Sequence, residues 1–212
     1  MKTVCCLLLL IAPALATADT YIVSFHAFAR ERQDKEAKDA LWALAERVKN
    51  PLCLRYVPYK KATDKEFMKK MRMLKKNATK GDVVIVYIDA HGNEWAGGLI
   101  ICCKEGRSIL SRDIFPLLED LPCPTLLLID TCHSGAALQH KWKKTTVVCA
   151  CRHDELSWTG GMGPAFLEAL RQPRQWTIEQ LAVDLMARTV ACRPDQHPVS
   201  FIGSTAKVRI TK

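Results

Sequence analysis

The chain has few aromatic side chains, 7% of its 212 residues, and it shows no low-complexity tract and no internal repeat. The missing repeat argues against a solenoid, which needs recurring units of about 20–50 residues. Apolar residues at 49% and charged residues at 25% are an ordinary globular balance, which excludes a disordered chain, a collagen and a simple coiled coil. The length suits one domain of common size.

Long hydrophobic runs are absent apart from residues 4–16, whose 13 positions fall short of the ~20 needed to cross a bilayer. This run follows Met1-Lys2 and ends in Ala16-Thr17-Ala18, the pattern of a secretory signal peptide. We therefore predict a signal peptide over residues 1–18 and an exported protein, periplasmic or secreted, that starts at Asp19 and keeps no stable membrane span. An uncleaved anchor is the alternative.

Zinc-type spacing is missing among the ten cysteines, because no pair of Cys-x-x-Cys motifs occurs with matching histidines, and no metal site is predicted. Cys5 and Cys6 lie in the predicted signal peptide. An exported chain permits disulfides among the other eight. Their pairing cannot be read from the sequence, and several lie in strand-like runs, where buried free cysteine is common.

The charge is unbalanced toward the basic side, with a formal net charge of +9 at pH 7. Lysine pairs such as Lys69-Lys70 and Lys143-Lys144 are scattered and are not interleaved with aromatic residues as in nucleic-acid-binding segments. We expect a solvated basic surface and no nucleic-acid partner. A protein that binds an anionic envelope or nucleic acid is the remaining alternative.

Short apolar runs alternate with amphipathic stretches along the chain. Strands are predicted over residues 21–25, 54–57, 83–88, 99–102, 108–110, 125–129, 146–151 and 199–202. Helices are predicted over 34–49, 63–77, a short stretch from 111, 164–170 and 177–191, with capping boxes at Thr63…Glu66 and Thr177…Gln180. This alternation predicts an α/β domain over residues 19–212, in which helices flank a mostly parallel central sheet.

Two of the predicted strands end in reactive residues. One runs into Asp89-Ala90-His91-Gly92 and the other into Asp130-Thr131-Cys132-His133. If these strands are parallel neighbours, His91 and Cys132 arrive at the same edge of the sheet. There a thiol and an imidazole can act as nucleophile and proton carrier, with the backbone amides of Gly92 and Cys132 as candidate oxyanion donors. A structural role for either residue, and His133 as the base, are the alternatives.

These motifs resemble those of the caspase-like clan of cysteine peptidases, and within it the metacaspases and their bacterial relatives. VVIVYIDAHG resembles the histidine motif of the clan, and LLLIDTCHSG resembles its nucleophile motif. Weaker similarities follow in the same order along the chain, at Lys38-Asp39-Ala40, ACRHDELSW, GMGPAFLEAL and Gln196-His197-Pro198. The resemblance implies a three-layer caspase-like sandwich, with a large-subunit-like part over 19–140, a small-subunit-like part over 146–212 and a polypeptide substrate.

The resemblance also implies a substrate preference, because metacaspases place acidic residues around the side chain before the scissile bond and cleave after Arg or Lys. Asp39 matches the acid of the first helix, and Asp154 falls next to the position of the second. Ser157 and Trp158 would support an extended substrate strand. A solvated helix carboxylate, a turn residue and a core tryptophan are the respective alternatives for Asp39, Asp154 and Trp158.

The chain departs from the family in two respects. Ala90 replaces the glycine that usually precedes the histidine, and the acidic cluster that binds calcium in many metacaspases is not evident. We therefore predict no cofactor, with calcium dependence doubtful. Activation by cleavage at Lys141, Lys143 or Lys144 is optional, and the oligomeric state cannot be read. The prediction is an exported cysteine endopeptidase, with a catalytically silent caspase-like binding module as the alternative.

Overall fold

The computed structural model describes the chain from Asp19 to Ile210 with several gaps. The described residues are 19–27, 35, 38–39, 42–46, 51–57, 61–158 and 161–210. The predicted signal peptide and much of the helix predicted over 34–49 lie outside them. No helix within the described ranges has the length and apolar character needed to cross a membrane.

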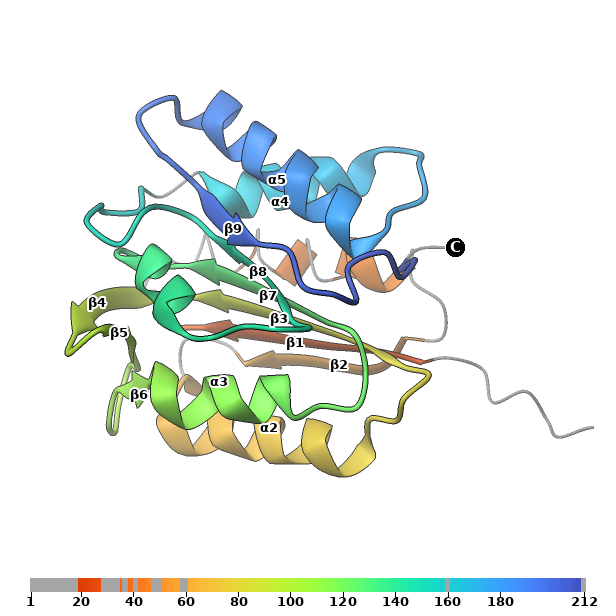
Figure 1. Cartoon of the computed structure of the whole chain (residues 1–212), viewed down its shortest axis with the longest axis horizontal. Coiled ribbons are helices and arrows are strands. Elements are labelled where there is room, and N and C mark those ends of the chain that lie inside the picture. Colours follow the sequence, from red (N-terminus) through yellow and green to blue (C-terminus); the bar gives the residue numbers. More distant parts are fainter. Residues whose placement is uncertain are drawn as a thin grey trace, which may run out of the picture.

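Six strands form the central sheet, in the order β2-β1-β3-β7-β8-β9 (Figure 1). Their bounds are Thr20–His26 (β1), Pro51–Val57 (β2), Val83–Asp89 (β3), Thr125–Asp130 (β7), Thr146–Cys149 (β8) and Val199–Phe201 (β9). The first five strands in this order are parallel, and β9 pairs antiparallel with β8 at one edge. The predicted, mostly parallel sheet is confirmed.

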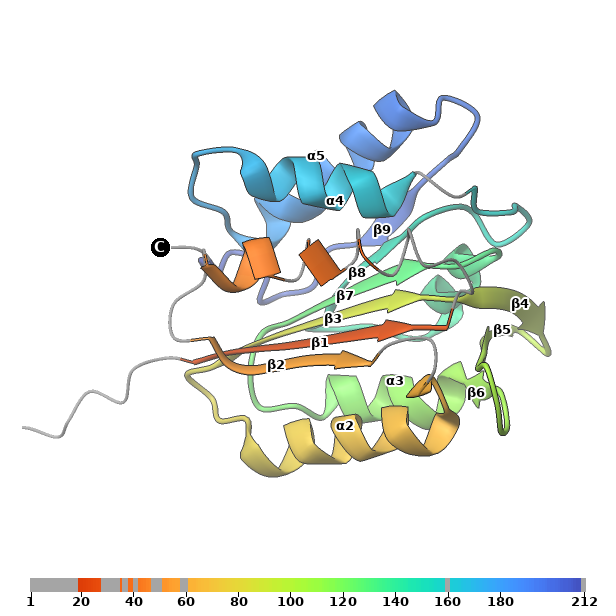
Figure 2. The same cartoon turned by 180° about the vertical axis from the view of Figure 1, so that it is seen from behind.

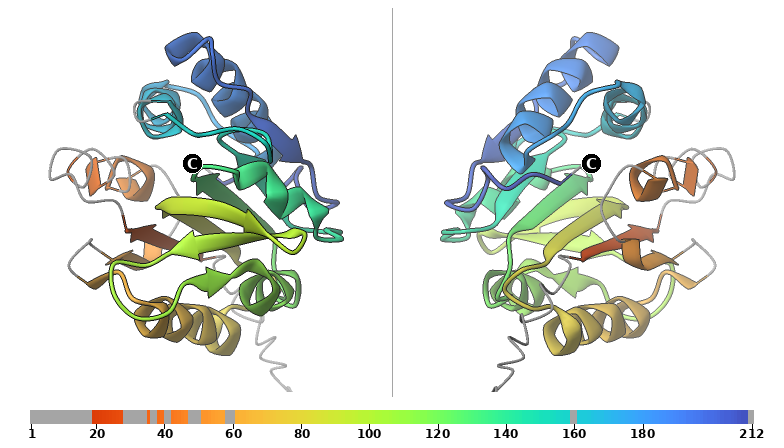
Figure 3. Two further views of the ribbon diagram at one scale, coloured as in Figure 1. Left: turned by 90° about the vertical axis from the view of Figure 1, so that its left-hand side faces the viewer. Right: turned by 90° about the vertical axis from the view of Figure 1, so that its right-hand side faces the viewer.

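Helices cover both faces of this sheet and complete three layers (Figures 2 and 3). One face carries α2 (Asp64–Asn77) and α3 (Ser111–Glu119), and the other carries α4 (Met162–Arg171) and α5 (Ile178–Cys192). The described part of the first helix, residues 42–46, packs on the α4 and α5 side through Leu44. The three-layer α/β sandwich is therefore also confirmed.

The central strand β3 explains why both faces need a helical layer. Val84, Val86 and Ile88 point into the core under α2 and α3. Val83, Ile85 and Tyr87 point into the core under α4 and α5. All six side chains are buried, as expected for a continuous apolar run in a parallel sheet.

The two predicted capping boxes have different outcomes. Thr177 and Gln180 exchange side-chain and backbone hydrogen bonds at the start of α5, so this box is complete. At α2 the Thr63 hydroxyl accepts a bond from the Glu66 N–H, but the Glu66 carboxylate lies 2.7 Å from Lys70 Nζ. The lysine one turn later binds this carboxylate, and the amide of Thr63 donates to the Lys61 carbonyl instead.

A second sheet of three short antiparallel strands lies beyond the carboxyl ends of the central strands (Figure 1). It comprises β4 (His91–Trp95), β5 (Gly98–Cys102) and β6 (Ile109–Leu110). The sequence predicts β5 and β6 but leaves His91 in a loop, because HGNEW has no apolar alternation. The hairpin turn at Ala96 and Gly97, whose φ angles are 50° and 74°, pairs this polar segment with β5 and so makes it a strand.

Candidate active site

The two reactive strand ends lie side by side because β3 and β7 are parallel neighbours. Asp89 pairs with Asp130 in the register of these strands, and the Ala90 N–H donates to the Asp130 carbonyl at 3.3 Å. His91 and Cys132 each follow two residues after this pair. The structure therefore brings both predicted residues to the same edge of the sheet.

Gly92 brings β4, the strand that begins with His91, into contact with residues 131–133. We call this segment the nucleophile loop, because it carries the predicted nucleophile Cys132. A Cβ atom on Gly92 would lie 2.4 Å from the Cys132 carbonyl oxygen and 2.5 Å from Thr131 Oγ1. Such distances do not occur between real atoms, so only glycine permits this approach. The two amides predicted as oxyanion donors thus belong to segments that touch each other.

The nucleophile loop has a left-handed residue directly after the cysteine. The half-buried Cys132 directs its Sγ toward the Ser157 carbonyl oxygen at 3.7 Å. His133 has a φ of 56° and opens a 3-10 helix, η2 (Ser134–Gln139). The N–H of His133 donates to the Glu155 carbonyl at 2.8 Å, and its Nδ1 bonds the His153 carbonyl at 2.8 Å. These bonds hold the loop against the turn that follows β8.

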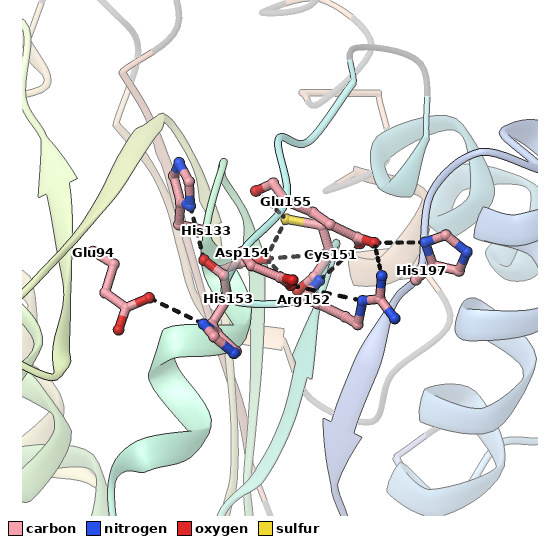
Figure 4. A network of polar contacts seen from close by, with 9 residues as sticks. Glu94, His133, Cys151, Arg152, His153, Asp154, Glu155 and His197 are labelled. Carbon is pink, nitrogen blue, oxygen red and sulfur yellow. Dashed lines mark hydrogen bonds and ion pairs between the residues drawn. The ribbon is translucent and has the colours of Figure 1, made fainter.

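That turn is itself held by Glu155, whose polar contacts are drawn in Figure 4. The Glu155 carboxylate lies 2.7 Å from the Arg152 guanidinium, 2.7 Å from His197 Nδ1 and 3.2 Å from the Arg152 amide. The carboxylate thus closes the turn on itself and ties it to the segment before β9. The sequence alone assigned no role to Glu155.

Glu94 connects β4 to η2 through Gln139 and to the turn after β8 through His153; Figure 4 shows the contact with His153. Its carboxylate accepts a bond from Gln139 Nε2 at 3.0 Å and lies 3.2 Å from His153 Nδ1. The bond from Gln139, together with the one from His153, holds the pKa of Glu94 below its ordinary value. Sequence reasoning missed this residue, because its partners lie 45 and 59 positions away.

A pair of carboxyl groups lies at the ends of β3 and β7, two residues before His91 and Cys132. Asp130 accepts bonds from the Ser157 hydroxyl at 3.0 Å and from the Tyr87 hydroxyl at 3.2 Å. Burial, with the nearby Asp89 carboxylate adding to it, raises the pKa of Asp130 to about 7. Asp89 lies 3.2 Å from Nδ1 of the buried His26, a histidine that the sequence left without a role. In the sequence, this pair is indicated by the aspartate that directly follows each of the two apolar runs, VVIVYI and TLLLI.

Two of the four predicted substrate-binding residues lie beside Cys132. Ser157 contacts both Cys132 and Asp130, as described above. The Trp158 N–H donates to Oε1 of the buried Gln196 at 3.1 Å, and the Arg193 guanidinium lies 5.7 Å from the centroid of the Trp158 ring. The side chain of Trp158 is 49% exposed, so it is not a core tryptophan.

The two predicted acids lie on the surface. The side chain of Asp39 is 50% exposed and pairs with Lys35 at 2.9 Å, and that of Asp154 is 62% exposed and lies 3.7 Å from Arg152. Among the described contacts, none joins Asp39 to Asp154 or to Cys132. Asp154 does line a cavity of about 550 Å³, together with Gly135 of η2.

The other cysteines differ from Cys132 in their surroundings. The seven cysteines whose side chains the structure describes are all unpaired. Burial raises the pKa of Cys103 to about 12 and that of Cys123 to about 11, and it raises the pKa of the fully enclosed Cys149 further. These thiols stay protonated and are poor nucleophiles. In the described ranges no three His, Cys, Asp or Glu side chains lie close enough to hold a metal ion.

Comparison with known proteins agrees with this geometry. A family model described as the caspase domain matches residues 21–201, so the chain belongs to the caspase-domain family. No curated protein matches it.

Solved structures share the fold at low sequence identity. The protein GSU0716 from Geobacter sulfurreducens is 16% identical, with a TM-score of 0.67 over 91% of this chain and 97% of that one. The Drosophila initiator caspase Dronc is 12% identical, with a TM-score of 0.61 over 92% of this chain and 82% of that one. At these identities the likeness shows the fold.

The Gly92 contact predicts that Gly92→Ala is strongly disruptive. The added methyl must push β4 away from the nucleophile loop, so the free energy of unfolding falls by about 1–3 kcal/mol. The rate at which iodoacetamide alkylates Cys132 changes as well. Gly81→Ala is the matched control, because nothing lies within 4 Å of a Cβ atom there. Equal stability of the two variants would contradict the close approach.

The raised pKa of Asp130 predicts a pH dependence of stability. Between the ordinary aspartate pKa and about 7, the folded chain holds a proton that the unfolded chain releases. The contribution of Asp130 to stability is therefore greatest in acid and declines as the pH rises toward 7. Urea unfolding from about pH 5 to about pH 8 should lose up to about 3 kcal/mol, and Asp130→Asn should flatten this slope. The exposed Asp120→Asn should leave the slope unchanged, and parallel slopes for all three proteins would refute the assignment.

Proposed function

We propose that this member of the caspase-domain family is a cysteine endopeptidase with Cys132 as nucleophile and His91 as proton carrier. The observation that carries the proposal is the register of β3 and β7, which places both residues two positions beyond the pair Asp89 and Asp130. Family membership supports the reaction class, with a polypeptide as substrate.

The site residues suit the steps of peptide hydrolysis. His91 takes the proton of the Cys132 thiol, the thiolate attacks the scissile carbonyl carbon, and the backbone amides of Gly92 and Cys132 donate to the oxyanion that forms. His91 then gives a proton to the departing amine, which leaves an acyl thioester on Cys132. Water attacks this thioester with His91 as base, and the carboxylic acid product and the free thiol are released.

We infer that the enzyme cleaves after Arg or Lys. The protein supplies three acids for a cationic side chain: Asp39 and Asp154, which the family resemblance singles out, and Asp130, whose contacts reach the nucleophile through Ser157. A guanidinium beside Asp130 would restore the ionised form of this carboxyl and form charge-assisted hydrogen bonds with it. Ser157 and Trp158 would hold the backbone of the substrate.

Export belongs to the same proposal. It rests on the charge and apolar pattern of residues 1–18, and it would place the enzyme in the periplasm or outside the cell.

Hydrolysis of fluorogenic peptides ending in Arg, Lys or Asp tests the reaction and its specificity. Cys132→Ala and His91→Ala should each lower kcat/KM by at least about 1,000-fold, whereas the exposed Cys192→Ala should leave it unchanged. Preference for Asp peptides would refute the acidic pocket. If the purified chain cleaves none of them and an Arg chloromethylketone does not label Cys132, the silent binding module replaces the enzyme.

Glu94 should act through the position of His91. Glu94→Gln keeps an acceptor for Gln139 but removes the ion pair with His153, so we expect kcat to fall about tenfold with little change in KM. Glu94→Ala should lose more. Glu105→Gln, at an exposed acid in the β5–β6 connection, is the control. A change confined to KM, or one shared by Glu105→Gln, would contradict a positioning role.

A further inference from the structure

The positive charge of the protein is concentrated in one segment. Residues 61–80 contain eight basic and two acidic residues, a net charge of six out of the nine carried by the whole chain. Seven of these basic side chains are exposed: Lys61, Lys65, Lys69, Arg72, Lys75, Lys76 and Lys80. The segment consists of α2 and its two flanks, so the charge belongs to one helix on the surface of the molecule.

Most basic residues of α2 lie on the face of the helix that points away from the core. Phe67, Met71 and Leu74 are buried against the sheet, which places Lys65, Lys69, Arg72 and Lys76 on the opposite face at spacings of four, three and four residues. We call these four residues the basic row. At 1.5 Å per residue the row is about 16 Å long, and α2 lies along the outside of its layer (Figure 3).

Within the described part of the chain, the ion pairs of α2 are Lys70 with Glu66 and Lys75 with Asp120. No described acid pairs with a member of the basic row. Like charges four residues apart destabilise a helix by a few tenths of a kcal/mol, and Lys65 stands in the first turn, where the helix dipole disfavours a cation. Lys76 in the last turn suits the helix dipole and Lys69 acts electrostatically on Glu66, but these effects are small and do not require a row of four charges.

The form of the row favours a broad anionic surface as its partner. Single-stranded nucleic acids are bound in grooves with aromatic platforms, and the one aromatic residue of α2, Phe67, is buried. Three of the four side chains are lysines, which act as hydrated point charges and do not grip a single phosphate in two places. Clusters of four to eight such charges on a helix bind anionic headgroups, and each adds to the affinity.

We propose that the basic row docks the protein on the surface of an anionic phospholipid bilayer. The apolar face of α2 is fully used in the core, so docking is electrostatic and nothing inserts into the bilayer. Thr63 at the start of α2 bridges to Glu105 in the β5–β6 connection, so the helix runs back from the carboxyl edge of the sheet. The bilayer would contact the side of the molecule and leave the site at that edge open.

Vesicle sedimentation with the full chain tests this docking. The probes are vesicles of phosphatidylcholine with about one-third phosphatidylglycerol, and vesicles of phosphatidylcholine alone, which report binding by the apolar N-terminal segment. We expect at least about tenfold stronger binding to the anionic vesicles near 50 mM salt, most of it lost near 300 mM salt. Equal binding to both vesicles would overturn the proposal.

Two variants with the same loss of net charge locate the surface. K65Q/K69Q/R72Q/K76Q should weaken binding to the anionic vesicles by at least about a hundredfold. R171Q/R174Q/K207Q/R209Q removes four exposed charges outside α2 and should change it by less than about threefold. If both variants lose the same amount of vesicle binding, net charge alone determines the binding. This result would refute a specific role for the basic row.

A single-stranded 20-mer and a 20-bp duplex, titrated at the same salt, complete the test. If either binds more tightly than the anionic vesicles and this binding is lost in K65Q/K69Q/R72Q/K76Q, the partner is a nucleic acid and the bilayer proposal is wrong. Peptide hydrolysis by both variants should equal that of the unaltered chain. The outcome for docking is thereby separate from the outcome for the proposed peptidase.

Discussion

The arrangement of the site depends on the pairing of β3 with β7. These strands are parallel and in register up to Asp89 and Asp130, so the two segments that follow leave the sheet at the same level. Each then needs only two further residues to reach His91 or Cys132. Parallel strands make this meeting a property of the backbone ladder, because the position of both residues is set by hydrogen bonds of the core. The side-chain contacts around the nucleophile refine a position that the sheet has already determined.

The surroundings of this edge combine two kinds of electrostatics. At the strand ends, Asp130 is partly buried beside Asp89, and desolvation and like charge favour its protonated form. Glu94 and Glu155 instead have polar partners, Gln139 and His153 for the first and Arg152 and His197 for the second, and these two histidines and the arginine are more than half exposed. The aspartate pair is sensitive to the charge of whatever enters the site. The two glutamates fasten the loops, and solvent screens their ion pairs, so each of these ion pairs contributes little to stability.

The sequence alone predicts most of the fold, because buried parallel strands have a strong signature. VVIVYI and TLLLI are continuous apolar runs, and they form β3 and β7 with the predicted limits to within a residue. The strand β4 was missed for the opposite reason. HGNEW is polar and becomes a strand only by pairing with β5 across a turn with positive φ angles. Tertiary pairing overrides weak local preference in such segments.

The sequence predicts the site residues that lie at the strand ends. It misses the site residues whose partners are far away in the sequence. His91, Gly92 and Cys132 follow strong strand signals, whereas Glu94 meets Gln139 and His153 only in the folded chain. Asp39 and Asp154 were chosen by resemblance, and the structure shows them paired with cations at the surface. The contacts of Asp130 were not predicted, because the sequence does not show which acidic side chains become desolvated when the chain folds.

His91 and Cys132 belong to different sheets, the histidine to the small hairpin sheet and the cysteine to the end of the central one. The hairpin sheet joins the main body through the buried side chains of Leu99, Ile101 and Ile109, which belong to the core under α2 and α3, and through the Gly92 contact. A shift of this small sheet by about an ångström would move the His91 imidazole away from Cys132. A misplacement of that size costs an enzyme about a hundredfold in catalytic rate. Because Leu99, Ile101 and Ile109 are part of the core, such a shift would disturb apolar packing as well, so the position of His91 is held by the same interior that keeps the molecule folded.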